Sequence, residues 1–341
     1  MRVLVTGGAG FIGGNLCREL AGRPEIEAVV ALDDLSTGSA ENLRGVDAQL
    51  IEGSILDRGL LAELADAADA VVHLAALPSV PRSLADPLGT FEVNATGTVY
   101  VLEACRRKSL YIVAASSSSV YGDVPVSPKH EDLPTRPLSP YAMSKLTAEA
   151  AALAYGAAFG LPTLALRFFN VYGPLQTAGH AYAAVIPTFI TSALQGGQLQ
   201  IYGDGGQVRD FTFVTTVTRV LADAVLRQVT NPVPVNLAFG TRVSVAELAE
   251  RVATATGMRP EVCHRPPRRG DVRESQADCT RFRALFPAAR PVSLDQGLGA
   301  TIAWFRQNQP GLGLPQQRGS ARERVPGLGQ ATEAQSRHDE L

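Results

Sequence analysis

The sequence predicts an α/β protein: a doubly wound parallel sheet followed by a smaller C-terminal α/β lobe. Short apolar runs alternate with helical patterns through the first half of the chain. These runs are apolar at every position, which is typical of strands covered by helices on both faces. The first run, residues 3–6, breaks into Gly7-Gly8-Ala9-Gly10 and resumes as a helical pattern. Together these observations indicate a Rossmann-type sheet that binds a ligand beside its first strand.

The remaining elements follow the same alternation. We expect strands near residues 3–6, 28–32, 48–52, 70–75, 110–115 and 163–169, and helices near 11–20, 56–65, 87–107 and 140–159. Prolines and glycines then punctuate shorter elements, which predicts a second lobe. The expected domains are residues 1–165, with returns near 208–240, a discontinuous lobe over 166–309, and a disordered tail over 310–341.

Composition excludes several classes of function. The chain has 341 residues, 45% of them apolar, and a net charge of −2, so neither a nucleic acid nor a membrane is an expected partner. Cys17, Cys105, Cys263 and Cys279 are scattered and contain no metal-binding spacing. Reduced thiols and the lack of a signal-peptide pattern predict a cytoplasmic protein without a metal.

The glycine-rich turn carries the first functional prediction. A strand, a glycine turn and a helix place backbone N–H groups and a helix N-terminus against a diphosphate. Gly7 permits the tight turn, Gly10 lets the backbone approach the phosphates, and Gly13 lets the helix and strand pack closely. Asp33 ends the second apolar run. A carboxylate there suits the ribose hydroxyls of NAD and repels the 2′-phosphate of NADP.

A hydroxyl-rich segment and a helix carry the second prediction. The run Ser116 to Ser119 follows the fifth strand, where it is either a polar turn or part of the ligand crevice. Ser139-Pro140 begins a helix in which Tyr141 and Lys145 lie one turn apart. An ammonium beside a phenol lowers the pKa of the phenol, so Tyr141 becomes a candidate general acid and base. The alternative is an incidental pair on a surface helix.

At this point the chain resembles the extended short-chain dehydrogenase/reductases, in particular the NAD-dependent epimerase/dehydratase group that acts on nucleotide sugars. The matching segments, spread over about the first three hundred residues, are TGGAGFIG, LDD, HLAA, SSSSVYG, SPYAMSK, RFFNVYGP and GDGGQVRDF. The resemblance implies Ser117, Tyr141 and Lys145 as catalytic residues. It also implies a set of NAD contacts: Gly7, Gly10, Phe11, Ile12, Gly13, Asp33, Asp34, Ser36, Gly38, Ser54, Ile55, Leu74, Ala75, Ala76, Asn94, Tyr141, Lys145 and Phe169.

The same resemblance implies a UDP-sugar as substrate. Its expected contacts are Ser83, Ser117, Ser118, Tyr141, Asn170, Val185, Ile201, Tyr202, Arg209, Arg268, Asp271 and Ser275. Arginine side chains suit phosphate binding. The alternative interpretation of Arg209 is a salt bridge to the neighbouring Asp210. Ser275 stands where glucose-restricted relatives carry a bulky tyrosine, so a 2-acetamido group fits. Arg82 instead favours a C6 carboxylate.

The serine run also distinguishes among the reactions of this family. Sugar 4,6-dehydratases carry Asp-Glu after the catalytic hydroxyl, whereas this chain carries Ser118 and Ser119, which cannot serve as acid and base at neutral pH. The expected activity is therefore 4-epimerisation of a UDP-hexose with tightly bound NAD. A UDP-glucuronate epimerase, a dehydratase, a 4-ketoreductase and a non-catalytic NAD sensor are the alternatives. His73 is expected to be a packed residue, and the helices over 87–107 and 140–159 to form a homodimer interface.

Overall fold

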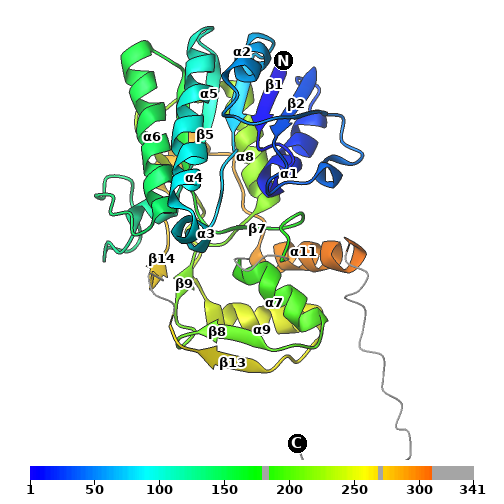
Figure 1. Ribbon diagram of the computed structural model, residues 1–341. Coiled ribbons are helices and arrows are strands. Elements are labelled where there is room, and N and C mark those ends of the chain that lie inside the picture. The colour runs from blue at the N-terminus through cyan, green and yellow to red at the C-terminus, as the bar shows by residue number, and fades with distance from the viewer. Residues whose placement is uncertain (179–183, 268–271, 309–341) are drawn as a thin grey trace, which may run out of the picture.

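A computed structural model describes residues 1–178, 184–267 and 272–308 (Figure 1). Its centre is a seven-stranded sheet in the order β11-β6-β5-β4-β1-β2-β3, and every neighbouring pair is parallel. The strands are β1 (Arg2–Thr6), β2 (Ala28–Asp33), β3 (Gln49–Glu52), β4 (Ala70–His73), β5 (Tyr111–Ser117), β6 (Thr163–Phe168) and β11 (Val235–Leu237). The direction of winding reverses between β1 and β4, where such sheets bind ligands. The predicted doubly wound parallel sheet is confirmed.

Helices cover both faces of this sheet (Figure 1). On one face α1 (Phe11–Ala21) and α8 (Val214–Arg227) pack against side chains such as Val3 and Val72. On the other face α2 (Arg58–Asp66), α5 (Gly97–Arg106) and α6 (Pro140–Phe159) pack against side chains such as Leu4 and Ile112. Successive strand residues thus enter opposite cores, which is why the strands are apolar at every position.

The helix expected over residues 87–107 is interrupted. It consists of α4 (Pro87–Phe91), one π-helical segment η2 (Glu92–Thr96), and α5. Asn94 in η2 is buried, and its side chain bonds the backbone of Leu77 and, at 3.0 Å, the Ser144 hydroxyl. A π-helical turn often marks a functional site, and this one ties α6 to the loop after β4.

The second lobe lies below the sheet in Figure 1. It contains β8 (Leu199–Tyr202) paired with β13 (Val262–Arg265), and a three-stranded sheet of β9 (Val208–Arg209), β12 (Val243–Ser244) and β14 (Glu274–Ser275). Helices α7 (Val185–Leu194), α9 (Val245–Thr256) and α11 (Leu294–Asn308) share its apolar core. Of the segment expected to return to the main sheet, α8 covers that sheet and β11 joins it, whereas β9 pairs within the second lobe.

Short elements complete the described fold: β7 (Val171–Tyr172) with β10 (Thr212–Phe213), the helices α3 (Val80–Ala85) and α10 (Thr280–Leu285), and the 3₁₀ turns η1 (Ala40–Leu43) and η3 (Ser118–Tyr121). Within the described ranges, no helix combines the length and apolar character needed to cross a bilayer. The tail expected over 310–341 lies outside the described residues.

Candidate active site

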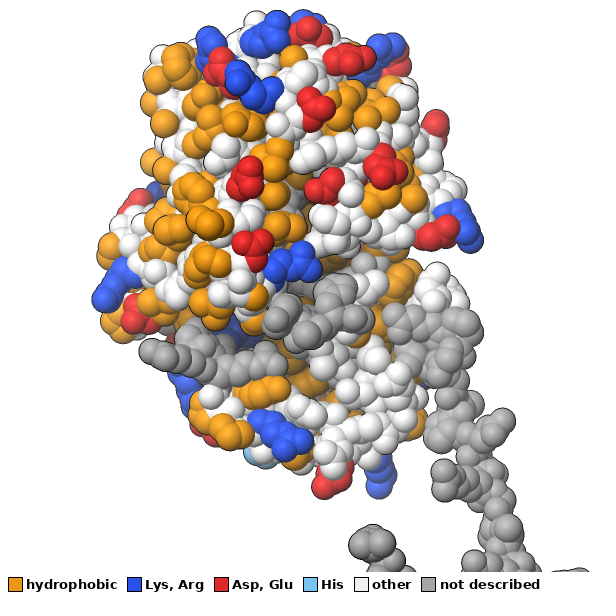
Figure 2. Space-filling model, in the orientation of Figure 1, with side chains coloured by type: hydrophobic (Ala, Val, Ile, Leu, Met, Phe, Trp, Pro, Cys, Tyr) orange, Lys and Arg blue, Asp and Glu red, His pale blue; other side chains and the backbone are white. Residues whose placement is uncertain are grey.

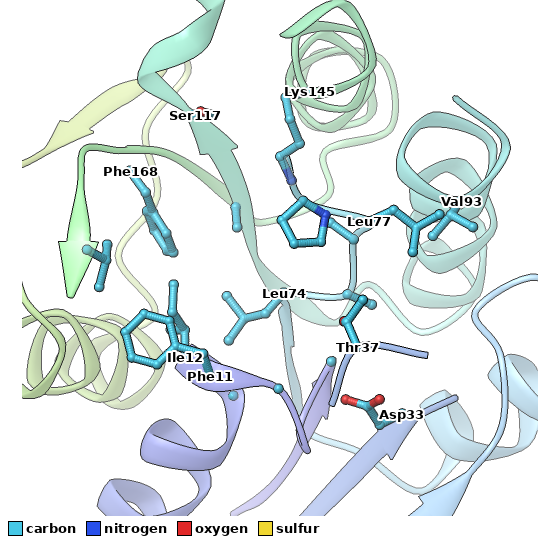
Figure 3. Close-up of a pocket in the computed structure, with 18 of the residues that line it drawn as sticks. Phe11, Ile12, Asp33, Thr37, Leu74, Leu77, Val93, Ser117, Lys145 and Phe168 are labelled. Carbon is cyan, nitrogen blue, oxygen red and sulfur yellow. The ribbon is translucent and has the colours of Figure 1, made fainter. Parts of the chain in front are cut away.

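A cavity of about 380 Å³ opens at the carboxyl ends of the central strands (Figure 3). It lies where the winding of the sheet reverses, as expected for a nucleotide site. Most of the predicted cofactor and catalytic residues line it: Gly7, Gly10, Phe11, Ile12, Gly13, Asp33, Asp34, Ser36, Ile55, Leu74, Ala75, Ala76, Ser117, Tyr141, Lys145 and Phe169; the predicted substrate residue Asn170 lines it as well.

The glycine-rich turn brings bare backbone to one wall of this cavity. Gly7 has φ +71°, and a Cβ there would lie 2.7 Å from the backbone nitrogen of Ala75. A Cβ on Gly13 would overlap the Gly7 carbonyl, so α1 packs directly on the turn. Gly10 is the N-cap of α1, and the first turn of that helix faces the cavity. This cradle fits the diphosphate of NAD, because the glycines bring backbone without side chains next to the helix N-terminus.

Asp33 is fixed at the end of β2. Its two carboxylate oxygens accept hydrogen bonds from the backbone N–H groups of Ala9 and Leu35, each at 2.9 Å. Burial raises the pKa of Asp33, and these hydrogen bonds oppose the rise. Figure 3 shows Asp33 and Thr37 at the end of the pocket away from Ser117. Gly38 does not line the cavity: a Cβ there would lie 2.9 Å from the Asp33 carboxylate, so its role is close packing.

The three predicted catalytic residues converge at the opposite end of the cavity. Ser117 ends β5, and Tyr141 stands in the first turn of α6, whose N-cap Ser139 accepts a hydrogen bond from the Ala142 N–H. Ser117 is a hydrogen-bond partner of the Tyr141 phenol. Lys145 follows one turn later and reaches from α6 into the pocket (Figure 3). This arrangement can bind one substrate oxygen and move its proton.

The electrostatics of this trio differ from the prediction. Burial raises the pKa of Tyr141, and only the hydrogen bond with Ser117 opposes the rise. Burial also lowers the pKa of Lys145 to about 8, against the opposing charge of Glu149. The expected fall in the pKa of Tyr141 is therefore corrected to a rise, because removal from water outweighs the hydrogen bond with Ser117.

His73 is a packed residue, as the sequence favoured. Its Nδ1 lies 2.7 Å from the Thr6 hydroxyl and its Nε2 lies 2.9 Å from the Thr98 hydroxyl. Thr98 donates its hydrogen to the Asn94 carbonyl, so Nε2 must carry the histidine proton. Burial lowers the pKa of His73 to about 3, and the ring is neutral at ordinary pH.

A second cavity of about 280 Å³ adjoins the first. Asn170, Val171 and Gln176 line both cavities, so the two spaces meet at these residues. Of the predicted substrate residues, Val185, Tyr202 and Arg209 also line the second cavity. The neighbouring Asp210 is fully buried, and its carboxylate accepts hydrogen bonds from Gly240, Thr241 and Ala277. Three backbone N–H groups and one hydroxyl therefore hold that carboxylate.

Two predicted substrate residues line neither cavity, and their side chains serve the packing of the protein. Ser83 is fully buried, and its hydroxyl donates to the Val80 carbonyl inside α3 at 2.7 Å. Ile201 is 2% exposed and belongs to the core of the second lobe. The hydroxyl hydrogen of Ser83 is thus used within α3, and Ile201 is packed among apolar side chains.

Other predicted residues lie near the cavities without lining them. Ser54 accepts a hydrogen bond from the Leu56 N–H, and Asn94 supports the loop after β4. Ser118 begins η3 directly after Ser117, and Ser275 on β14 pairs in register with Arg209. Arg268 and Asp271 lie outside the described residues.

Sequence reasoning missed Gln176. Its Nε2 donates to the Val171 carbonyl at 3.3 Å, while its buried Oε1 has no hydrogen-bond partner among the described residues. The available signal was its place two residues after the segment RFFNVYGP, whose Asn170 was predicted. Further lining residues that were not predicted are Leu32, Thr37, Gly53, Leu77, Pro78, Val93, Ala115, Ser116, Phe168 and Val171.

Comparisons with known proteins agree with this geometry. Residues 3–238 match the NAD dependent epimerase/dehydratase family. The chain is 38% identical to the UDP-glucose 4-epimerase of Mycolicibacterium smegmatis, over 90% of this chain and 99% of that protein. The structure of the Thermus thermophilus UDP-glucose 4-epimerase in complex with NAD aligns with a TM-score of 0.82 and 36% identity, over 90% of this chain and all of that one.

A second solved structure is the UDP-N-acetylglucosamine 4-epimerase of Methanobrevibacter ruminantium M1 in complex with UDP-N-acetylmuramic acid. It aligns with a TM-score of 0.84 and 33% identity, covering 90% of this chain and 98% of that chain. Other matching relatives are named as a decarboxylase of a UDP-sugar acid and as dTDP-glucose 4,6-dehydratases. Similarity therefore leaves the individual reaction open, while cofactor and substrate class agree. The chain belongs to the NAD dependent epimerase/dehydratase family, whose members act on nucleotide sugars with NAD.

Proposed function

We propose that this protein is a nucleotide-sugar 4-epimerase that interconverts a UDP-hexose and its C4 epimer. One observation carries the proposal: the Ser117–Tyr141 hydroxyl pair lines the cofactor cavity and is followed along the chain by Ser118 and Ser119. Elimination of water needs a carboxylic acid and a carboxylate beside that pair. Two serines at these positions instead favour a reaction in which C4 is oxidised and then reduced again, without elimination of water.

The side chains divide the work at the sugar as follows. Tyr141 takes the proton of the C4 hydroxyl, and Ser117 donates a hydrogen bond to the same oxygen. NAD, held by the glycine turn and Asp33, would supply the acceptor and donor of the C4 hydride. Lys145 holds a positive charge beside the reacting phenol, which favours its deprotonated form. After the 4-keto sugar has turned over, Tyr141 returns the proton on the other face. The glycine turn and Asp33 hold the cofactor through these steps.

The second cavity supports the choice of a UDP-sugar. It meets the first cavity at Asn170, Val171 and Gln176, so a nucleotide bound in the second cavity can extend its sugar into the first. Arg209 supplies positive charge for the diphosphate. Ser275 is small, pairs with Arg209 across β14 and β9, and does not extend into either cavity, which is compatible with a 2-acetamido group. We therefore propose that UDP-N-acetylglucosamine is accepted along with UDP-glucose.

The test is a product analysis. The protein is incubated with NAD and, separately, with UDP-glucose, UDP-N-acetylglucosamine and UDP-glucuronate, and the sugars are identified by NMR. We expect the C4 epimer of the first two, without net change in nicotinamide absorbance. A 4-keto-6-deoxy sugar, a pentose with carbon dioxide, or stoichiometric reduction of NAD would each contradict the proposal. Epimerisation of UDP-glucuronate alone would assign the pocket to a C6 carboxylate at Arg82.

We also propose that the protein forms a homodimer. Exposed apolar side chains gather on α3, α4 and α6, where Leu88 is 82% exposed, Leu84 65% and Met143 44%. Figure 2 shows hydrophobic surface over the side of the molecule formed by α4, α5 and α6. Such a face suits a second copy of the chain. Light scattering should give twice the chain mass, falling to the chain mass in Leu84→Glu/Leu88→Glu; an unchanged mass in that variant would contradict this interface.

A further inference from the structure

Three side chains on α6 form a row that extends beyond the catalytic pair. Tyr141, Lys145 and Glu149 are four residues apart, so each lies one helical turn below the last on one face. Tyr141 and Lys145 line the cavity, whereas Glu149 lies beneath it with 4% of the residue exposed. The row therefore runs from the reacting phenol into the interior of the protein.

Glu149 is held by two strands of the sheet. Its Oε1 accepts a hydrogen bond from Arg167 Nη2 at 2.7 Å, and its Oε2 accepts from Arg167 Nε at 2.8 Å and from the Ser116 hydroxyl at 2.6 Å. The Arg167 guanidinium stacks 4.7 Å from the centre of the Tyr121 ring. Both side chains of the ion pair are 4% exposed. A buried ion pair rarely stabilises a fold more than apolar side chains of equal volume, so stability is a poor reason for this one.

The contacts of Glu149 all lead to the candidate active site. Ser116 precedes Ser117 on β5, and Arg167 precedes Phe168, another lining residue, on β6. The carboxylate is also the charge that raises the pKa of Lys145, against the burial that lowers it. Without that charge, burial would lower the pKa of Lys145 further.

Other groups around α6 do not replace this charge. His73 at the end of β4 is neutral, and Tyr111 on β5, Tyr121 on η3 and Cys105 on α5 have pKa values raised by burial. The charged residues on the elements packed against α6 are Arg82 on α3, Glu92 on η2, Glu103 and Arg106 on α5, and Arg167 on β6. Glu92 is exposed, and Glu103 pairs with Arg106 on the outer surface. Glu149 is thus the buried carboxylate of this group.

We propose that Glu149 is a positioning residue that keeps the Lys145 ammonium protonated in the buried site and, through Ser116, fixes the end of β5 that carries Ser117. The inference rests on the proposed function, because it takes Lys145 as the working ammonium of that reaction. It adds a residue that touches neither the cofactor nor the sugar cavity.

The composition of the chain makes a direct test possible. The sequence contains three lysines, Lys108, Lys129 and Lys145, so protein labelled with ¹³C at lysine gives three sets of Cε signals. Lys145→Met identifies the signal of Lys145, and its chemical shift followed against pH gives the titration midpoint without any need for turnover. The test variant is Glu149→Gln, which removes only the carboxylate charge and leaves an amide oxygen that can accept from Arg167. Glu149→Asn is the second variant, should Glu149→Gln fail to fold.

The matched control is Glu131→Gln. Glu131 is also a buried carboxylate near an arginine, 3.7 Å from Arg281, and it accepts a hydrogen bond from the Asn236 N–H. We expect the Lys145 midpoint, near pH 8 in the unaltered protein, to fall by about one pH unit in the Glu149 variants and to stay in place in the control. An unchanged midpoint in a folded Glu149 variant overturns the proposal, since a purely structural pair would change only the melting temperature.

Turnover separates this inference from the proposed function. The alkaline limb of kcat/KM for the accepted UDP-sugar should move to lower pH by the same amount as the Lys145 midpoint. If the unaltered protein epimerises no UDP-sugar but the midpoint still falls in the variants, the proposed function fails and the control of Lys145 by Glu149 stands. If the protein epimerises and the midpoint does not move, the reverse holds.

Discussion

Asp33 offers the sharpest test of how the cofactor is held. In Asp33→Asn the amide oxygen can accept only one of the two backbone N–H groups that the carboxylate binds at 2.9 Å, those of Ala9 and Leu35. The other N–H then meets an NH₂ group. One buried donor without an acceptor costs about 1–3 kcal/mol, so the free energy of unfolding should fall by about that amount. The glycine turn, to which Ala9 belongs, should loosen.

The larger effect should fall on cofactor binding. Hydrogen bonds to a charged group contribute about 1.5–3 kcal/mol each, and loss of about 2–3 kcal/mol raises Kd roughly 30- to 160-fold. We expect such a rise for NAD measured by calorimetry, with a smaller change for NADP, because the 2′-phosphate no longer meets a negative charge. Glu52→Gln is the control, since Glu52 is exposed and lies directly opposite Asp33 on β3. An unchanged ratio of NAD to NADP affinity in Asp33→Asn would refute this account of the site.

Three further predictions follow from the same geometry. Tyr141→Phe should lower kcat by about 10²- to 10⁴-fold while NAD binding measured by calorimetry is retained, and full turnover would remove Tyr141 from the mechanism. Gly13→Ala should abolish NAD binding, because its Cβ would overlap the Gly7 carbonyl; Gly257→Ala, at the end of α9, is the control for loss of a glycine far from the cavity. The pKa of His73 is about 3 in the folded protein against 6.5 in the unfolded chain, so the unfolded chain binds the proton more readily. The contribution of His73 to the free energy of unfolding, measured by urea unfolding, should therefore be complete above pH 6.5 and decline as the pH falls toward 3. A urea midpoint independent of pH over that range would show that His73 is not buried as described.

Much of the fold and site could be predicted because the signals are local. Apolar runs predict buried parallel strands, a glycine-rich turn predicts bare backbone at a helix N-terminus, and Ser139-Pro140 predicts the start of α6. Periodicity alone then places Tyr141 and Lys145 on one face of that helix. These features depend on residues within a few positions of one another, so the chain specifies them before it folds.

The tertiary structure decided everything that depends on burial and on partners far apart in the chain. Ser83 and Ile201 were expected to contact the substrate, but the Ser83 hydroxyl bonds within α3 and Ile201 packs in the core of the second lobe. The pKa of Tyr141 rises because the whole site is withdrawn from water, which no neighbour in sequence reveals. In the sequence Glu149 is an ordinary polar residue of a helix. Only the folded sheet brings Ser116 of β5 and Arg167 of β6 to its carboxylate. Charges and hydrogen bonds change in strength with burial, and burial is a property of the folded chain rather than of any segment.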